Sequence, residues 1–166
     1  GAGKTTVIRL ISCLLIPTKG EIKISGYDIY KDQNEIRKII GVLPEFTSLY
    51  PRMKIYEYLK FFAELYEVPE KFFKEKVEEL YKIFRIENEN LILDVLSKGL
   101  RQKVSLIRTL IHNPSVILLD EPTSGLDPES SKIVKEYIIS LKNQGKSILI
   151  ATHNLQEAEY FSDRIA

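Results

Sequence analysis

The sequence predicts an α/β fold, in which helices flank a mainly parallel sheet and a helical subdomain is inserted into the chain. Two short runs alternate with segments of helical periodicity: residues 116–119 are apolar throughout, and residues 147–151 are apolar after Ser147. Such strands are typical of a parallel sheet that is covered on both faces. A stretch from about residue 55 to residue 92 differs from the rest, because it is rich in Lys, Glu, Tyr and Phe, has helical spacing and lacks strand-like runs.

The composition is that of one domain with room for a hydrophobic core, since the chain has 166 residues. Lys and Arg total 24 against 23 Asp and Glu, which gives a formal net charge of +1. This balance provides no basic surface for a nucleic acid or an anionic membrane. The single cysteine, Cys13, excludes an internal disulfide, and no apolar run reaches the roughly 18–20 residues of a membrane helix. We therefore expect a soluble, intracellular domain without a nucleic-acid partner.

Three elements are expected before the helical stretch: a helix over residues 5–15, a strand over residues 21–25 and a short buried strand over residues 39–43. Residues 17–20 form the turn after the helix, and Gly26 and Asp28 form the turn after the first strand.

The helical stretch contains two helices, which Pro69 separates. The first carries Phe61, Phe62, Leu65 and Tyr66, and the second carries Phe72, Phe73, Val77, Leu80, Tyr81 and Phe84. The strand over residues 116–119 is followed by a helix over residues 129–143, which Gly145 ends, and then by the strand over residues 147–151. We expect a helical subdomain at about residues 55–110 and a catalytic core built from residues 1–54 and 111–166.

The chain opens on Gly1-Ala2-Gly3-Lys4-Thr5-Thr6, which matches the end of a phosphate-binding loop. In such a loop, glycines let backbone N–H groups approach phosphate oxygens, the lysine reaches the β- and γ-phosphates, and the threonine hydroxyl binds Mg²⁺. The strand that precedes such a loop would lie before Gly1, so we expect a fragment that is poorly stable or has an unpaired strand edge. Taken alone, the hexapeptide is equally compatible with an ordinary glycine-rich helix start.

The strand over residues 116–119 leads into two adjacent carboxylates, Asp120 and Glu121. Ligands of open α/β sheets bind at the carboxyl ends of the strands. There Asp120 could hold Mg²⁺, and Glu121 could polarise a water molecule for attack on a γ-phosphate. A strand that simply ends in a charged loop is the alternative, and it is less attractive for an acid pair in a chain that also contains Gly3-Lys4-Thr5.

The segment from Ser124 to Asp127 follows the acid pair at once, and Asp127 is also placed to cap a helix whose first residue is Pro128. His153 comes just after the strand over residues 147–151, where its ring could hydrogen-bond a terminal phosphate. His112 lies at a predicted helix C-terminus, where a partial positive charge suits the helix dipole, and we assign it no chemistry.

These segments, in this order, resemble the ATP-binding cassette of ABC transporters. Residues 96–103, Leu-Ser-Lys-Gly-Leu-Arg-Gln-Lys, look like the signature motif of that family, and residues 41–45, Gly-Val-Leu-Pro-Glu, look like its Q-loop. The resemblance covers essentially the whole chain. It implies a P-loop NTPase fold, Mg²⁺-dependent ATP hydrolysis, and ATP and Mg²⁺ as ligands.

The resemblance also implies a role for each matching residue. Lys4, Glu121 and His153 would be catalytic, with Glu121 as the catalytic carboxylate. Mg²⁺ would be bound by Thr5, Asp120 and Glu45. The nucleotide would be bound by Gly1, Ala2, Gly3, Lys4, Thr5, Thr6, Glu45, Ser97, Gly99 and Asp127.

The sequence departs from the usual family pattern at one position of the Q-loop and at two positions of the signature motif. Glu45 stands where the family usually has Gln, and Lys98 and Leu100 stand where Gly and Gln are usual. This form resembles the ABC-2 subset of exporters, whose members are associated with sodium, drug or polysaccharide export. The departures are therefore interpreted as features of that subset.

In the family two cassettes meet head to tail, so Ser97 and Gly99 would contact nucleotide that a second cassette binds. A transmembrane permease would be the other partner, which implies a cytoplasmic location on the inner face of the cell membrane. Candidates for the permease contact are Tyr50, Pro51, Arg52, Met53 and Tyr56, although Tyr56 fits the subdomain core equally well. Two alternatives stay open. One is a soluble cassette ATPase that acts on ribosomes or DNA, and the other is a module that only binds nucleotide, against which the presence of both Glu121 and His153 argues.

Overall fold

The computed structural model describes residues 3–45 and 49–165. Its centre is a three-stranded sheet with the strand order β3 (Ile40–Leu43), β4 (Val116–Asp120), β5 (Ser147–Ala151). Both strand pairs are parallel, which confirms the predicted α/β fold. Leu43 lies opposite Leu119, and Asp120 lies opposite Ala151. The residues that follow these strands therefore meet at one edge of the sheet.

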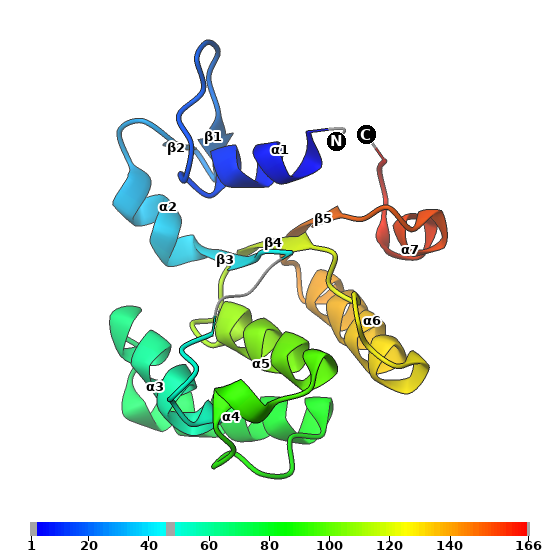
Figure 1. Ribbon diagram of the computed structural model, residues 1–166. Helices are drawn as coiled ribbons and strands as arrows, with labels where there is room; N and C mark the ends of the chain where they lie inside the picture. Colours follow the sequence, from blue (N-terminus) through cyan, green and yellow to red (C-terminus); the bar gives the residue numbers. More distant parts are fainter. Residues whose placement is uncertain (1–2, 46–48, 166) are drawn as a thin grey trace.

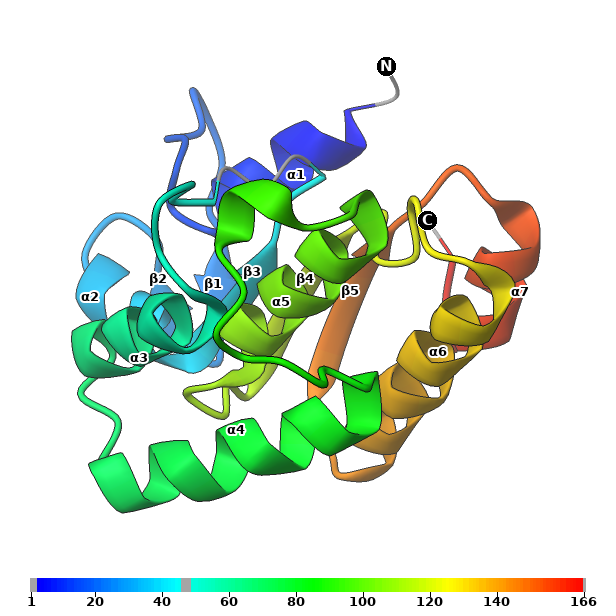
Figure 2. The same cartoon turned by 60° about the horizontal axis from the view of Figure 1, so that its bottom comes forward.

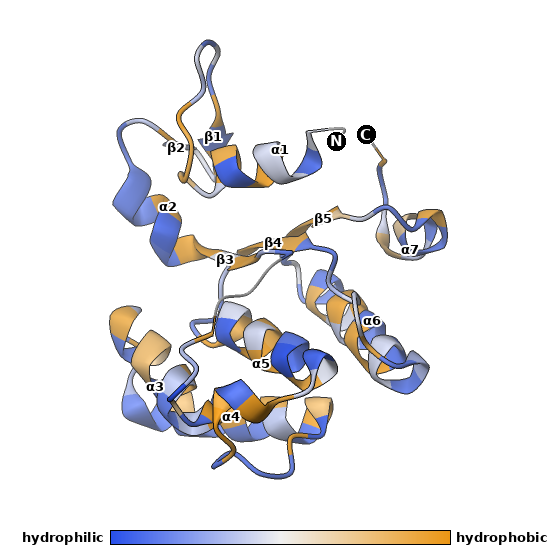
Figure 3. Cartoon of the chain, in the orientation of Figure 1, coloured by the Kyte–Doolittle hydropathy of each residue, from blue (hydrophilic) through white to orange (hydrophobic). Residues whose placement is uncertain are grey.

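Helices cover both faces of this sheet, as expected (Figures 1 and 2). α1 (Lys4–Ile11) lies on one face, where Ile8 packs against Leu118 and Ala151. α5 (Lys98–Leu110) and α6 (Pro128–Asn143) lie on the other face. Figure 3 shows the three strands in hydrophobic colours between these layers. Burial of β3 and β4 between these layers explains why these two strands are apolar along their length.

α1 is shorter than predicted, because the chain leaves the helical conformation at Cys13. Cys13 has a φ of 57°, a left-handed conformation of the kind that ends helices. The backbone N–H of Leu14 then donates to the carbonyl of Arg9 at 2.9 Å. The prediction of a helix over residues 5–15 is therefore wrong beyond Ile11, and Leu14, expected on its apolar face, is 70% exposed.

The strand predicted over residues 21–25 is one arm of a short antiparallel hairpin. β1 (Lys23–Ile24) pairs with β2 (Tyr27–Asp28). Ser25 and Gly26 connect them with φ values of 50° and 87°, and a type I′ turn requires positive φ at both central residues. The turn at Gly26 is confirmed, whereas Asp28, expected in the turn, belongs to β2.

A further helix, α2 (Gln33–Ile39), was not predicted. Ile36 is its one buried residue, and the positions around it are Gln, Asn, Glu, Arg and Lys. A single anchor of this kind leaves no repeating apolar signal in the sequence. Because Ile39 ends this helix, β3 begins at Ile40, one residue later than expected.

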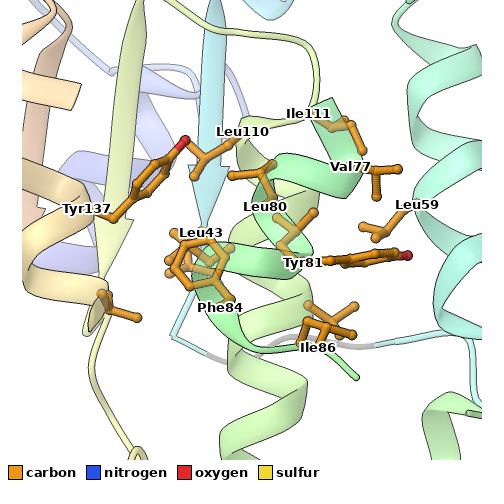
Figure 4. Close-up of a cluster of buried hydrophobic side chains, with 14 of the residues drawn as sticks. Leu43, Leu59, Val77, Leu80, Tyr81, Phe84, Ile86, Leu110, Ile111 and Tyr137 are labelled. Atoms are coloured by element: carbon orange, nitrogen blue, oxygen red, sulfur yellow. The ribbon is translucent and has the colours of Figure 1, made fainter. Parts of the chain in front are cut away.

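The stretch from residue 55 onward contains α3 (Ile55–Leu65), α4 (Glu70–Phe84) and the 3₁₀ helix η1 (Leu93–Val95) before α5. Pro69 precedes α4 as its N-cap residue, while Tyr66, expected within the first helix, follows α3 as its C-cap residue. Buried side chains of these helices, of β3 and of α6 form one cluster (Figure 4). Its largest members with no exposed surface are Tyr58, Phe84, Leu43, Ile55, Leu59, Leu80, Ile107 and Ile111. Among the described residues, no helix combines the length and the apolar character that crossing a membrane requires.

α5 connects the helical stretch to the sheet. Nη2 of Arg108 donates to the carbonyl of Val42 on β3 at 3.0 Å, and its guanidinium group lies over the ring of Phe62 on α3 at 5.3 Å. The hydroxyl of Thr109 donates to the same carbonyl at 3.1 Å. Gly41 allows this close packing, since a Cβ there would lie 2.3 Å from the carbonyl oxygen of Thr109.

β5 is less buried than predicted. Its side chains alternate in exposure, and Leu149 is 39% exposed. Within the described ranges β5 pairs with β4 alone. Its other side faces a cavity of about 750 Å³ that residues of α1, α6 and α7 (Leu155–Phe161) help to line. The continuous apolar run therefore indicates a strand correctly but overstates its burial.

His112 is not the cation that its position at a helix C-terminus suggests. Its ring stacks on Tyr66 with 3.8 Å between ring centroids, and Nε2 donates to the carbonyl of Ile40 at 2.9 Å. Burial lowers the pKa of His112, and the hydrogen bond to Ile40 opposes this only in part. The loss of water around the ring is the main cause, and the nearby positive charge of Lys146 lowers the pKa of His112 further.

We expect His112 to make the protein less stable in mild acid. Because the pKa in the folded state lies below the ordinary 6.5, the unfolded chain binds a proton at a pH where the folded chain does not. The free energy of unfolding should fall as the pH drops through about 6.5 and should level off once the folded ring titrates. Urea unfolding of the full-length protein and of His112→Phe at several pH values checks this. The variant should lose this part of the pH dependence, and equal pH dependence in both proteins would contradict the prediction.

Candidate functional site

Asp120 and Thr5 meet at the carboxyl edge of the sheet. Asp120 ends β4 and is 3% exposed, and the hydroxyl of Thr5 in α1 donates to its Oδ2 at 2.9 Å. These residues are 115 positions apart in the chain, so the fold is what brings them together. The result is a pair of oxygen donors, one charged and one neutral, at a single point of the edge.

The first turn of α1 begins at a glycine whose backbone conformation few other residues adopt. Gly3, the N-cap residue, has a φ of 82°, and no atom lies within 4 Å of the place that a Cβ would occupy. Lys4 follows it, and its side chain lines the same cavity as Ala151 and Thr152. Thr6, two positions after Lys4, is exposed. Gly1 and Ala2, also predicted to bind nucleotide, lie outside the described residues.

Glu121 occupies a left-handed turn directly after β4. Its φ is 50°, a conformation that costs on the order of 1–3 kcal/mol for a residue other than glycine. The backbone N–H of Glu121 donates to the carbonyl of Ala151 at 2.9 Å, so β5 holds one side of this peptide. A strained backbone that the surrounding structure maintains is typical of functional sites.

The carboxylate of Glu121 points at His153. Its Oε1 accepts hydrogen bonds from the backbone N–H and from Nδ1 of His153, both at 2.8 Å. The Glu121 side chain is 13% exposed, whereas the His153 side chain is 81% exposed. With Nδ1 donating to Glu121, the opposite nitrogen of the ring carries a hydrogen only in the protonated form. His153 therefore orients the carboxylate and presents its other edge to the solvent.

Asp127 caps α6, as the sequence predicts. Its Oδ1 accepts from the backbone N–H of Ser130 at 2.9 Å, and Pro128 takes the first helical position. These hydrogen bonds from Ser130 lower the pKa of Asp127. Helix capping is by itself a sufficient reason for an aspartate at position 127, and contact with nucleotide would be a second role.

Ser97 is the N-cap residue of α5, and Gly99 in its first turn lies close to the segment that precedes α6. The Ser97 hydroxyl accepts from the backbone N–H of Leu100 at 3.2 Å. A Cβ on Gly99 would lie 3.5 Å from the carbonyl oxygen of Gly125 and 3.6 Å from the Leu126 side chain. The contacts of this helix start therefore lead to residues 125–126 rather than to Lys4 or Thr5.

Glu45 is exposed and follows β3 at the same sheet edge. It directly precedes residues 46–48, which lie outside the described ranges, and its side chain makes no hydrogen bond or ion pair with a described residue. Its predicted role toward metal or nucleotide stays a prediction.

Two buried polar residues near Glu121 were not predicted. Gln102 on α5 is 7% exposed and donates to the carbonyls of Glu121 and Pro122. Glu157 on α7 is 5% exposed and accepts from the Thr123 hydroxyl at 2.7 Å. The available signal was weak in both cases, namely a polar residue on an otherwise apolar helix face.

Lys135 supplies the charge that Glu157 needs in its buried position. Its Nζ lies 3.1 Å from Oε1 of Glu157. The pair links α6 to α7, the helix that follows His153, and through Thr123 it reaches the segment after Glu121.

The oxygen donors fit a hard divalent cation. Mg²⁺ prefers one or two protein oxygens and completes its shell with water and substrate phosphates, which is what the Thr5 hydroxyl and the buried Asp120 carboxylate offer. The left-handed Gly3 leaves open space at the start of α1, where backbone N–H groups suit an anion. The described residues contain no cluster of three or more His, Cys, Asp or Glu side chains that could enclose a metal by themselves. The site thus fits a metal that arrives with phosphates.

The fold and this edge define a nucleotide-binding ATPase of the P-loop class. The ABC transporter family model matches residues 1–124, and the chain belongs to that family. The predicted P-loop NTPase fold and the predicted class of ATP-binding ATPase are confirmed by this match.

Curated relatives agree over nearly the whole chain. The sequence is 42% identical to the ABC transporter ATP-binding protein NatA of Bacillus subtilis, in an alignment that covers 99% of this chain and 68% of that protein. It is 36% identical to the Nod factor export ATP-binding protein I of Cupriavidus pinatubonensis, over 96% of this chain and 49% of that protein. The chain thus spans between about half and about two thirds of these relatives' length.

Solved structures agree as well. The structure of an ATP-binding subunit of an ABC transporter superposes with a TM-score of 0.91 at 32% identity, and covers 98% of this chain and 68% of that one. A dimeric ATP-binding cassette in a post-hydrolysis state, bound to ADP and Pi, superposes with a TM-score of 0.82 at 27% identity, and covers 96% of this chain and 73% of that one.

Proposed function

We propose that this protein is the ATP-hydrolysing subunit of an ABC transporter and that it powers export through a separate membrane permease. The observation that carries the proposal is the arrangement at the carboxyl edge of the sheet. There the Thr5–Asp120 pair lies next to a carboxylate that His153 orients. In this proposal residues 55–110 form a helical subdomain, and residues 1–54 and 111–166 form the catalytic core.

In the proposed reaction Glu121 activates the attacking water. Its carboxylate takes a proton as the water oxygen bonds to the γ-phosphorus, and the bond from that phosphorus to the β–γ bridging oxygen breaks to give ADP and phosphate. His153 holds the carboxylate through two hydrogen bonds, which fixes the direction in which it can accept the proton. Lys4 stabilises the negative charge of the phosphates, and the N–H groups at the start of α1 add to this.

Thr5 and Asp120 would hold Mg²⁺, with Glu45 as a further candidate. When bound, the metal neutralises phosphate charge as the γ-phosphoryl group is transferred. We therefore expect chelation by EDTA to stop phosphate release from the full-length protein, and added Mg²⁺ to restore it. Hydrolysis that continues at the full rate in EDTA would contradict the assignment of Thr5 and Asp120.

A second cassette is the first proposed partner. The start of α5, with Ser97 and Gly99, does not contact the Thr5–Asp120 edge of its own chain but lies against residues 125–126. The partial positive charge of a helix start suits phosphate that another cassette holds. The dimeric cassette among the similar solved structures supports the pairing of two cassettes.

A membrane permease is the second proposed partner, and it would hold the protein at the cytoplasmic face of the cell membrane. Tyr50 and Phe61 form an aromatic surface, with 50% and 38% of each residue exposed and 5.9 Å between their ring centroids. Tyr56, by contrast, packs on Phe73 with 5.5 Å between centroids and contacts the core cluster. The core interpretation is therefore favoured for Tyr56, and Met53 packs against the same cluster. Tyr50, Pro51 and Arg52 stay the contact candidates.

Purification of the tagged full-length protein from detergent-solubilised membranes tests the transporter assignment. We expect a multi-span membrane protein to co-purify. Tyr160, which is 53% exposed on α7, provides the matched control, since Tyr160→Ser should leave this recovery unchanged while Tyr50→Ser lowers it. Recovery with ribosomes or DNA and without a membrane protein would contradict the proposal and favour a soluble cassette ATPase.

A further inference from the structure

Gln102 joins α5 to the turn that carries Glu121. It lies one turn after the start of α5 and is 7% exposed. Its Nε2 donates to two consecutive carbonyls, that of Glu121 at 3.2 Å and that of Pro122 at 3.1 Å. A side-chain amide nitrogen has two hydrogens, so both are used on this one turn.

The turn depends on such partners because of its backbone. Glu121 is left-handed, with a φ of 50°, and such a conformation persists only where several contacts impose it. On its N–H side the peptide is held by Ala151 of β5 at 2.9 Å. On its carbonyl side the backbone N–H of Ser124 donates from within the turn at 3.1 Å, and Gln102 of α5 donates from outside it at 3.2 Å. The direction of the Glu121 carboxylate therefore depends on where α5 lies relative to the sheet.

The same end of α5 contacts the segment in front of α6. The Lys98 side chain lies over Gly125, where an added Cβ would be 2.6 Å from Cδ and from Cε of the lysine. Gly125 has a φ of 74°, so its backbone favours glycine, and the Lys98 side chain occupies the space beside it. A displacement of the start of α5 would be felt at residue 125 and, through Gln102, at Glu121.

We propose that Gln102 is a positioning residue that makes the orientation of the Glu121 carboxylate depend on the position of helix α5. This rests on the proposed function, in which the start of α5 engages nucleotide held by a second cassette. Contact between the start of α5 and the nucleotide held by the second cassette is then communicated through Gln102 to the Glu121 carboxylate, which acts on the nucleotide held by this chain. Gln102 acts on the rate of hydrolysis and on the coupling between the sites, and it leaves ATP binding by Lys4 and Thr5 unchanged.

The variant Gln102→Leu tests this in the full-length protein with Mg²⁺ and ATP. Leucine keeps the volume but donates no hydrogen bond. We expect kcat for phosphate release to fall about 10²-fold, the size of effect that a small misplacement of a reacting group produces, and the KM for ATP to stay within about twofold. The Hill coefficient for ATP should fall toward one. Equal losses in kcat and in ATP affinity would contradict the proposal, because they would indicate a general structural role.

Ser105→Ala is the matched control for folding. Ser105 is fully buried on the same helix, and its hydroxyl donates to the carbonyl of Arg101 at 2.8 Å. Its loss removes a buried hydrogen bond from α5 without touching Glu121, so we expect kcat to be unchanged at a comparable shift in melting temperature. A loss of kcat in this variant as large as in Gln102→Leu would overturn the proposal.

The double variant Gln102→Leu/Glu121→Gln separates this inference from the proposed function. If Gln102 acts through the carboxylate, the double variant should hydrolyse ATP no more slowly than Glu121→Gln alone, whereas independent action predicts a further 10²-fold loss. If Glu121→Gln itself hydrolyses ATP at the normal rate, the proposed role of Glu121 fails, and the role of Gln102 fails with it; a full-length protein that does not hydrolyse ATP would overturn the proposed function. If Glu121→Gln is inactive and Gln102→Leu retains normal kcat, only the role of Gln102 fails.

Discussion

Replacing Glu121 by Gln is expected to lower ATP hydrolysis by about 10²- to 10⁴-fold, the range associated with the loss of a general base. The amide keeps the shape of the side chain and an oxygen that can accept from the backbone N–H of His153, which lies 2.8 Å from Oε1 of Glu121. It cannot take a proton from water. Because it also removes one negative charge beside the phosphates, the ATP-bound dimer should persist. Phosphate release and size-exclusion chromatography with ATP measure the two effects.

Glu159→Gln is the matched control for this variant. Glu159 is an exposed carboxylate on α7, near His153 in the sequence, so its neutralisation changes the net charge equally without entering the edge of the sheet. Turnover should stay at the unmodified level. Phosphate release by Glu121→Gln at the same rate as by Glu159→Gln would remove Glu121 from the mechanism.

Lys4→Ala is expected to weaken ATP binding roughly 10- to 150-fold, which corresponds to the loss of about 1.5–3 kcal/mol from a hydrogen bond to a charged group. Lys4 is exposed at the start of α1 and lines the cavity beside Ala151 and Thr152. Its truncation should therefore leave the fold intact. Calorimetric titration of ATP into the full-length protein measures the dissociation constant.

Lys71→Ala provides the comparison, because Lys71 is exposed on α4, which is remote in the fold from the start of α1. An ATP affinity of Lys4→Ala equal to that of Lys71→Ala would contradict the assignment. The two variants of the site are also distinguishable from each other. Loss of Lys4 should act on binding, and loss of the Glu121 carboxylate should act on the rate at saturating ATP.

The elements that sequence patterns predicted well are those whose burial is uniform. β4 is buried on both faces, and the strand expected over residues 116–119 differs from it by one residue. The helix expected over residues 129–143 differs from α6 by one residue as well, since Asp127 and Pro128 mark its start chemically. α2 was missed because a single buried residue, Ile36, anchors it. The end of α1 was misplaced because nothing in the apolar pattern shows that Cys13 turns left-handed.

The site residues also divide into those that the sequence located and those that it missed. The residues at strand ends, Asp120, Glu121 and His153, were located by the rule that parallel strands deliver their carboxyl ends to one edge. Whether they perform the proposed chemistry is for the variants to test. Gln102 and Glu157 were missed because their partners are backbone carbonyls and a hydroxyl from distant segments. His112 was misjudged because its environment depends on Tyr66, which is remote in sequence.

α5 is one short, uninterrupted helix, and we expect it to move as a rigid unit. Its 13 residues extend for roughly 20 Å. Arg108 attaches one end to β3 and to Phe62 beside the aromatic surface, and Gln102 attaches the other end to the turn at Glu121. A displacement at the aromatic surface would thus be transmitted to the turn at Glu121 along a single helix, with no loop between them to absorb it. Gly99 lies in the first turn of this helix and lacks a side chain that would stiffen it, so the helix should deform first at the end proposed to meet a second cassette.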